Sequence, residues 1–199
     1  MAKIKLTKNE QKKQKDALKM YSRYLPTLIL KKQQLQMEIR QVELKVEDVE
    51  SKISTINEEF KTWIGVFGED VGLDGNLISV KRIVTENGNI AGVNIPIFKG
   101  AEFDDVSYDL FLMPLWVDKA VEKLKQVMLL DLEIKVLREQ ARLLGDELRV
   151  TTQRVNLFEK VKIPETKSNI KKIAVYLGDQ QTASVVRGKI AKKKLVKVS

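Results

Sequence analysis

The side chains that most often perform chemistry in proteins are absent from this sequence. It contains no cysteine and no histidine, so the commonest zinc ligands and the commonest pairs of nucleophile and base are missing. It also has no glycine-rich loop followed by Lys and Ser or Thr, which a P-loop nucleotide site requires. These absences argue against catalysis, and we expect no catalytic residue and no cofactor.

One acidic stretch has the residue types for a divalent cation. The segment EFDDVSYD contains Asp104, Asp105 and Asp109, and carboxylate oxygens are ligands that calcium and magnesium accept. However, the stretch lacks the central glycine and the final glutamate of an EF-hand loop. A polar loop is therefore the favoured interpretation, and no metal site is expected.

Basic side chains are concentrated at both ends of the chain. Residues 1–32 contain ten Lys or Arg against two acids, and residues 166–199 contain nine against one. Each end therefore carries +8, and because the net charge is +9, residues 33–165 carry −7. Two strongly basic ends on an otherwise acidic chain are expected to lie in acidic surroundings.

Long helices must position these ends. From Leu18 to Trp63, apolar residues recur at alternating steps of three and four, and Lys32 is the single exception. A 3.5-residue repeat held this long predicts a coiled-coil seam. A second series of the same kind runs from Val127 to Phe158. Two such seams joined by a middle segment fold most simply as an antiparallel helix pair.

Local signals mark where these helices begin and bend. Thr7 and Glu10 form a capping-box pattern, so the first helix is expected to begin near Lys8. Pro26 lies inside the first seam, which continues on both sides of it, so we expect a bend rather than a break. Pro164 follows the second seam and is expected to interrupt the helix or restart it.

The middle of the chain differs in kind from the two seams. Seven of the ten glycines fall between Gly65 and Gly100. Two β-branched runs flank Asn87 and Gly88, which predicts a β-hairpin over about 78–98 with its turn at this Asn-Gly pair. An isolated hairpin is marginal in water, so it should lean on the helices or on a partner.

The predicted fold is therefore mainly α, a long antiparallel two-helix coiled coil with a short β-hairpin inserted in the middle. Its parts are an N-terminal arm over 1–64, a middle region over 65–113, and a C-terminal arm with a basic tail over 114–199. In the antiparallel register, the residues after Leu177 have no partner helix. Pro96 predicts that the second strand lies at a sheet edge.

Three classes of function remain open from the residues alone. A coiled-coil arm with a basic tip is suited to binding the phosphates of nucleic acid. However, the basic ends carry few aromatic side chains for base stacking, and they contain no helix-turn-helix or other motif that recognises base sequence. The other two classes are a chaperone or tether that uses the helix pair as a clamp, and a mechanical part. No apolar run approaches the ~20 residues of a membrane span, and the N-terminus lacks a signal peptide, so a cytoplasmic location is expected.

Four stretches resemble the signatures of the D subunit of V-type and A-type rotary ATPases. They are KLTKNEQKKQKD, RYLPTLILKKQQLQ, RVNLFEKVKIPE and IKKIAVYLGDQQTASVVRGKIAKKK. They cover both arms in order and with matching spacing, whereas the middle region is similar only in plan. The resemblance implies a non-catalytic rotor shaft of the central stalk, which transmits torque between the catalytic A/B ring and the ion-translocating membrane rotor.

The resemblance also implies partners and site residues. The partners would be the A, B and F subunits and a funnel-shaped rotor adaptor, with no nucleic acid and no direct membrane insertion, and the location would be cytoplasmic and peripheral to the membrane. Pro26 and Pro164 would bend the shaft, and the hairpin turn at Asn87 and Gly88 would serve contacts outside the ring. The residues implied as contacts to the ring bearing are Lys12, Lys13, Arg23, Lys31, Lys32, Arg187, Lys189, Lys192, Lys193 and Lys194.

Overall fold

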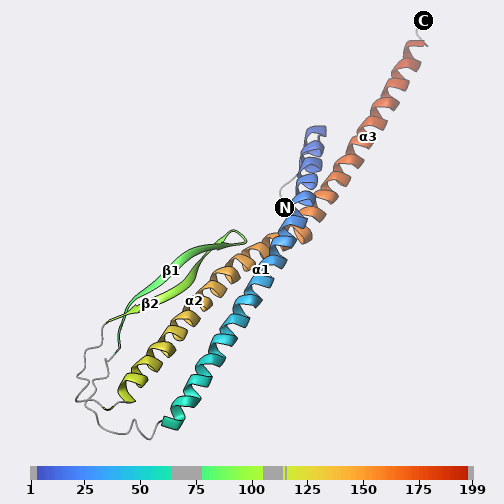
Figure 1. Cartoon of the computed structure of the whole chain (residues 1–199). Helices are drawn as coiled ribbons and strands as arrows, with labels where there is room; N and C mark the ends of the chain where they lie inside the picture. The colour runs from blue at the N-terminus through green and yellow to red at the C-terminus, as the bar shows by residue number, and fades with distance from the viewer. Residues whose placement is uncertain (1–3, 64–77, 105–113, 115, 197–199) are drawn as a thin grey trace. The chain divides into compact units, whose positions relative to one another are not determined.

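A computed structural model describes residues 4–63, 78–104, 114 and 116–196. They form helix α1 (Lys8–Trp63), strands β1 (Val80–Ile90) and β2 (Val93–Phe103), helix α2 (Trp116–Asn156), the π-helical segment η1 (Leu157–Lys162) and helix α3 (Ile163–Val196) (Figure 1). The predicted fold, mainly α with a two-strand antiparallel hairpin in the middle, is confirmed. The chain divides into two compact parts: the central part, residues 33–149, and the terminal part, residues 1–32 with 150–199.

Helix α1 begins where its capping signal predicts. The Thr7 hydroxyl oxygen accepts a hydrogen bond from the backbone N–H of Glu10 at 3.3 Å, and the first helical residue is Lys8. The Glu10 carboxylate in turn accepts a bond from the side-chain amide of Gln14 at 2.9 Å. Pro26 lies inside the helix, which continues past it. The expectation that this proline does not break the helix is confirmed, and the bend stays a prediction.

In the central part, α1 and α2 pack against each other in antiparallel order. The Arg138 guanidinium lies 2.7 Å from the Glu50 carboxylate, and the Lys123 amine lies 2.9 Å from the Glu59 carboxylate, so partner numbers fall along α2 as they rise along α1. The buried apolar cluster between the helices belongs to the two predicted seams. Its helical members are Leu35, Val42, Val49, Ile134, Leu137 and Leu144.

The β-hairpin has a different register from the one that the sequence predicts. Ile90 pairs with Val93 across a two-residue turn formed by Ala91 and Gly92. Both turn residues have positive φ, 51° and 81°, which is the signature of a type I′ turn. The paired strands reach Phe103, beyond the predicted end at residue 98.

The predicted turn at Asn87 and Gly88 is therefore wrong. These residues lie inside β1, opposite Pro96 and Ile95. Gly88 serves close packing instead, because a Cβ at this position would lie 2.5 Å from the Cδ1 atom of Ile97. A local Asn-Gly pair favours a turn only when no longer-range packing competes with it.

The hairpin docks on the helix pair, as an isolated hairpin must. Ile95 is 2% exposed and belongs to the buried cluster, and Ile90 and Val93 pack against that cluster from either side of the turn. The side-chain amide of Gln140 donates a hydrogen bond to the carbonyl oxygen of Pro96 at 2.5 Å. Figure 1 shows the two strands lying along α2. Each strand is an edge of this two-stranded sheet, in agreement with the prediction from Pro96.

In the terminal part, the two arms also meet across an antiparallel seam. The rings of Tyr21 and Phe158 lie 5.1 Å apart between centroids. Buried apolar seam positions on this side include Val155 and Ile173. The same seam also buries polar side chains, which contribute less to coiled-coil stability than apolar residues. They are Thr151, Thr166 and Asn169.

The helix changes its hydrogen-bonding pattern just before Pro164. The backbone N–H of Ile163 donates to the carbonyl oxygen of Phe158, five residues back, where an α-helix bonds four residues back. Pro164 has no N–H for the carbonyl of Lys160, and its ring would crowd that carbonyl in an unbroken α-helix. The α-helical pattern resumes in α3 at Ile163, one residue before Pro164, so the chain stays helical throughout, and a π-helical turn stands where an interruption was expected.

The end of α3 extends beyond its partner helix. Since Tyr21 lies against Phe158 and α1 begins at Lys8, equal rise per residue places Lys8 level with residue 171, and burial on α3 continues to Ile173 and the half-buried Leu177. Side-chain exposure agrees, because every residue from 178 to 194 is exposed.

Candidate functional site

The division into two parts coincides with a division of charge. The terminal part contains 22 basic and 5 acidic side chains, and the central part contains 14 basic and 22 acidic ones. Their net charges are therefore +17 and −8. A partner of the terminal part meets a cationic surface, whereas a partner of the central part meets an anionic one.

All ten residues predicted to contact a bearing lie in the terminal part. Lys31 and Lys32 are half-buried, and the other eight are exposed. Lys32 occupies the one polar position of the first seam, where its aliphatic stem can cover apolar surface while its amine stays in water. The exposed eight are Lys12, Lys13, Arg23, Arg187, Lys189, Lys192, Lys193 and Lys194. Their contacts to a partner stay predictions.

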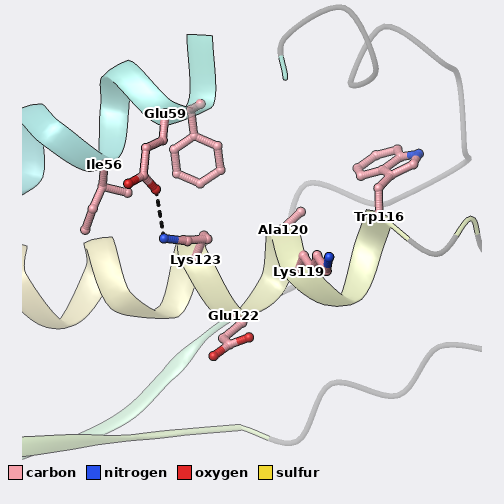
Figure 2. Close-up of a pocket in the computed structure, with 8 residues that line it drawn as sticks. Ile56, Glu59, Trp116, Lys119, Ala120, Glu122 and Lys123 are labelled. Atoms are coloured by element: carbon pink, nitrogen blue, oxygen red, sulfur yellow. Dashed lines mark hydrogen bonds and ion pairs between the residues drawn. The ribbon is translucent and has the colours of Figure 1, made fainter. Parts of the chain in front are cut away.

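The central part contains a cavity between the last turns of α1 and the first turns of α2. Its volume is about 240 Å³, and its apolar lining includes Ile56, Phe60 and Ala120. Figure 2 shows the Glu59 carboxylate and the Lys123 amine paired beside it. Such a cavity shows that the helix pair is packed less tightly here than around the buried cluster.

Shifted pKa values mark ion pairs within single helices. A hydrogen bond from Arg142 lowers the pKa of Glu139, and the same bond raises the pKa of Arg142. A hydrogen bond to Asp48 raises the pKa of Lys52. Each of these groups is exposed on a helix surface, so the shifts come from pairing in water and not from a desolvated catalytic pocket.

The acidic stretch predicted to be a polar loop is described only at its first aspartate. The Asp104 carboxylate accepts a hydrogen bond from the Ser79 hydroxyl, whereas Asp105 and Asp109 lie outside the described residues. Within the described ranges, no three or more potential metal ligands gather. No helix in the same ranges combines the length and the apolar character that a membrane span requires.

Two features of α2 escaped sequence reasoning. Leu132 and Gln140 are buried although both lie off the predicted seam, and the hairpin contacts Gln140 through the carbonyl oxygen of Pro96. Leu124, three residues before the second predicted seam begins, is 44% exposed. Apolar residues beside the seam, such as Leu129 and Leu132, were the available signal for burial off the seam.

Comparisons with known proteins agree with this architecture. The family model for the D subunit of ATP synthase matches residues 10–193. A protein of Borreliella burgdorferi described as the D subunit of a V-type ATP synthase is 55% identical over 197 residues, covering 99% of this chain and 97% of the relative. Proteins with the same description from Chlamydia abortus and Chlamydia muridarum are each 34% identical over 194 residues, covering 96% of this chain and 93% and 96% of those relatives. The match spans both arms and the hairpin between them, and the chain belongs to the family of ATP synthase D subunits.

Proposed function

We propose that this chain is the rotor shaft of a V/A-type ATPase, which transmits torque between the catalytic A/B ring and the ion-translocating membrane rotor. In this role it catalyses no reaction itself. The observation that carries the proposal is α1, whose 56 residues stay helical without a break and pair in antiparallel order with a second long arm. At ~1.5 Å per residue such a helix has ~80 Å of axis, a length that torque transmission needs and a small binding module does not.

The pairing of the arms supports a mechanical role. Twisting one helix about the other requires the seam side chains to slide past each other, and the buried cluster resists this because it is closely packed. The cross-helix pairs Glu50–Arg138 and Glu59–Lys123 also link the two arms. Exposed ion pairs add only ~0 to 1 kcal/mol each, so the apolar seam supplies most of the stiffness.

The terminal part is the end that turns within the ring. Its net charge of +17 favours acidic or carbonyl-lined partner surfaces. Single exposed charge contacts are weak, so they can be exchanged at each step of rotation. Bends at Pro26 and Pro164 would make the shaft eccentric, and an eccentric shaft pushes the catalytic sites in turn.

The central part is proposed to carry the partners outside the ring, the F subunit and the funnel-shaped adaptor. It is acidic, and it presents two apolar side chains on the outer face of α1, because Met37 and Leu44 are each 63% exposed. The docked hairpin lies on the same part of the chain. The complex would place the chain in the cytoplasm, peripheral to the membrane. The nucleic-acid alternative draws no support from the relatives, which are described as ATP synthase subunits.

A tethering experiment tests the rotor role. The chain has no cysteine, so Lys193→Cys introduces a single attachment point on an exposed position of α3. The assembled complex would be labelled there with a cleavable photo-crosslinker and illuminated. We expect continuous ATP turnover to stop when the shaft is tethered to an A or B subunit, and to recover when the tether is cleaved.

The matched control is the same variant labelled with a reagent that cannot crosslink, which should turn over ATP normally. A complex that keeps its full turnover rate with the shaft covalently held to the ring would refute the rotor role. Purification of the tagged chain without A and B subunits would count against it independently.

A further inference from the structure

Asn87 and Gly88 form a pair that can change chemically without any enzyme. The side-chain amide of an asparagine can be attacked by the backbone nitrogen of the next residue, and glycine permits this most readily because it has no side chain to crowd that nitrogen. The Asn87 side chain is exposed, so water reaches it. In this chain the pair lies within β1 and not in a turn, and this placement controls whether the reaction can start.

The reaction is a deamidation through a cyclic intermediate. The backbone nitrogen of Gly88 loses its proton and forms a bond to the side-chain carbon Cγ of Asn87, while the bond from Cγ to the amide nitrogen breaks and ammonia leaves. The product is a succinimide ring. Water then opens this ring at either of its carbonyl carbons and leaves aspartate or isoaspartate. In the net reaction an amide is replaced by an acid, one water is consumed and one ammonia is released.

The geometry of the paired strand opposes the first step. Asn87 pairs with Pro96 and Gly88 pairs with Ile95 in the antiparallel ladder, so the backbone is extended here. An extended backbone turns the Gly88 nitrogen away from the Asn87 side chain, because successive residues of a strand point to opposite faces. Ring closure requires the peptide unit between the two residues to rotate. The ladder prevents this rotation while the strands stay paired.

Packing of the hairpin holds this geometry in place and also requires the glycine. A Cβ atom at position 88 would lie 2.5 Å from the Cδ1 atom of Ile97, so a larger residue, which would slow the reaction, would have to displace Ile97. The ladder partner of Gly88 is Ile95, which is 2% exposed and belongs to the buried cluster between the helices. Docking of the hairpin on the helices therefore fixes the backbone at the reactive pair.

We propose that Asn87 is a site of spontaneous deamidation that is closed while the hairpin is docked and becomes reactive when the hairpin detaches from the helices. The inference concerns the hairpin alone and does not rest on the rotor role. Isoaspartate continues the main chain through its side-chain methylene group, so it adds one atom to the backbone of β1. The ladder between position 87 and the turn at Ala91 and Gly92 then loses its register. A reversible opening of the hairpin becomes a permanent loosening.

Peptide mapping by mass spectrometry tests the proposal residue by residue. The full-length chain would be incubated at mildly alkaline pH, and the same chain unfolded in guanidinium chloride gives the rate without the fold. Trypsin, which cleaves after Lys and Arg, releases residues 83–99 as one peptide with three asparagines: Asn87, Asn89 and Asn94. Asn89 and Asn94 are internal controls, because each is followed by a β-branched residue that crowds the backbone nitrogen.

We expect Asn87 to deamidate at least roughly tenfold more slowly in the folded chain than in the unfolded chain, because only the detached hairpin reacts. Ile95→Ala should raise the rate in the folded chain by at least about tenfold, towards the unfolded rate, because it favours detachment. Ile83→Ala is the matched control, since Ile83 lies on β1 but is 42% exposed, and it should change the rate far less. Gln140→Leu removes the hydrogen bond to the carbonyl of Pro96 and should also accelerate the reaction.

Equal rates at Asn87 in the folded and unfolded chains would overturn the proposal, because the fold would then give no protection. Equal rates in Ile95→Ala and Ile83→Ala, with helical circular dichroism retained in both, would show that docking does not control the site. The permanent loosening is tested by hydrogen exchange in residues 80–103. Exchange should be faster in aged chain that carries isoaspartate than in Asn87→Asp, which has the same charge on an unchanged backbone, and equal exchange would refute the loosening.

Discussion

Removing the side chain of Ile95 should detach the β-hairpin from the helix pair. Ile95 is 2% exposed and is the only strand residue among the buried members of the cluster in the described chain. Buried Ile-to-Ala changes cost ~2–5 kcal/mol, because the transfer energy of the lost methyl groups and the cavity left behind add up. Ile97 provides the matched control, since it lies on the same strand but is 38% exposed. Ile97→Ala should cost about 1 kcal/mol.

Amide hydrogen exchange of the hairpin is the appropriate assay, because the hairpin can open while the helices stay folded. Every 1.4 kcal/mol corresponds to a tenfold change in an equilibrium constant, so Ile95→Ala should accelerate exchange in residues 80–103 by at least about tenfold. Exchange in α1 should change far less.

The comparison between the two variants tests whether Ile95 anchors the hairpin to the helices. If Ile95→Ala and Ile97→Ala accelerate hairpin exchange equally, Ile95 is not the anchor. Loss of protection along α1 together with the hairpin would show that the two form one cooperative unit. Gln140→Leu offers a second probe, because it removes the bond to the Pro96 carbonyl without creating a cavity.

Three other predictions concern the terminal part and the helix surface. Truncation after Val186 should leave the melting temperature of the isolated chain nearly unchanged, because residues 187–194 are exposed. The truncation should weaken ring binding most at low ionic strength, where the lost ionic contacts are least screened. A large drop in melting temperature would show that the tail is packed against the rest of the chain. Pro26→Ala should raise the melting temperature more than Pro164→Ala, because proline costs ~3 kcal/mol inside an unbroken α-helix, whereas the π-helical turn before Pro164 already relieves the clash of its ring with the carbonyl oxygen of Lys160. Equal effects would contradict this. A hydrogen bond from Arg142 lowers the pKa of Glu139 in the folded chain. The Glu139–Arg142 pair therefore contributes to stability above the unfolded pKa of Glu139, and this contribution is lost as the pH falls through the lowered folded pKa. NMR titration of Glu139 should show that the shift disappears in Arg142→Ala.

The arms were predictable because their signals are periodic and local. The capping residues Thr7 and Glu10 and the repeat from Leu18 onward depend only on neighbours within a helix, so they predict the start of α1 and its buried stripe. The positive charge of the terminal part was predictable as well, because net charge depends only on the composition of a segment.

The sequence by itself determined the two helical arms, their antiparallel order and the basic character of both ends, because heptad spacing and charge act within each segment or between two matched seams. Tertiary structure alone decided where the hairpin turns and which face of α2 is covered. Asn87 and Gly88 satisfy the local preference for a turn, but the turn at Ala91 and Gly92 lets Ile95 enter the buried cluster. Burial of a large apolar side chain is worth ~1.5–3 kcal/mol, which exceeds the differences between local turn preferences, so packing against α2 determines the register.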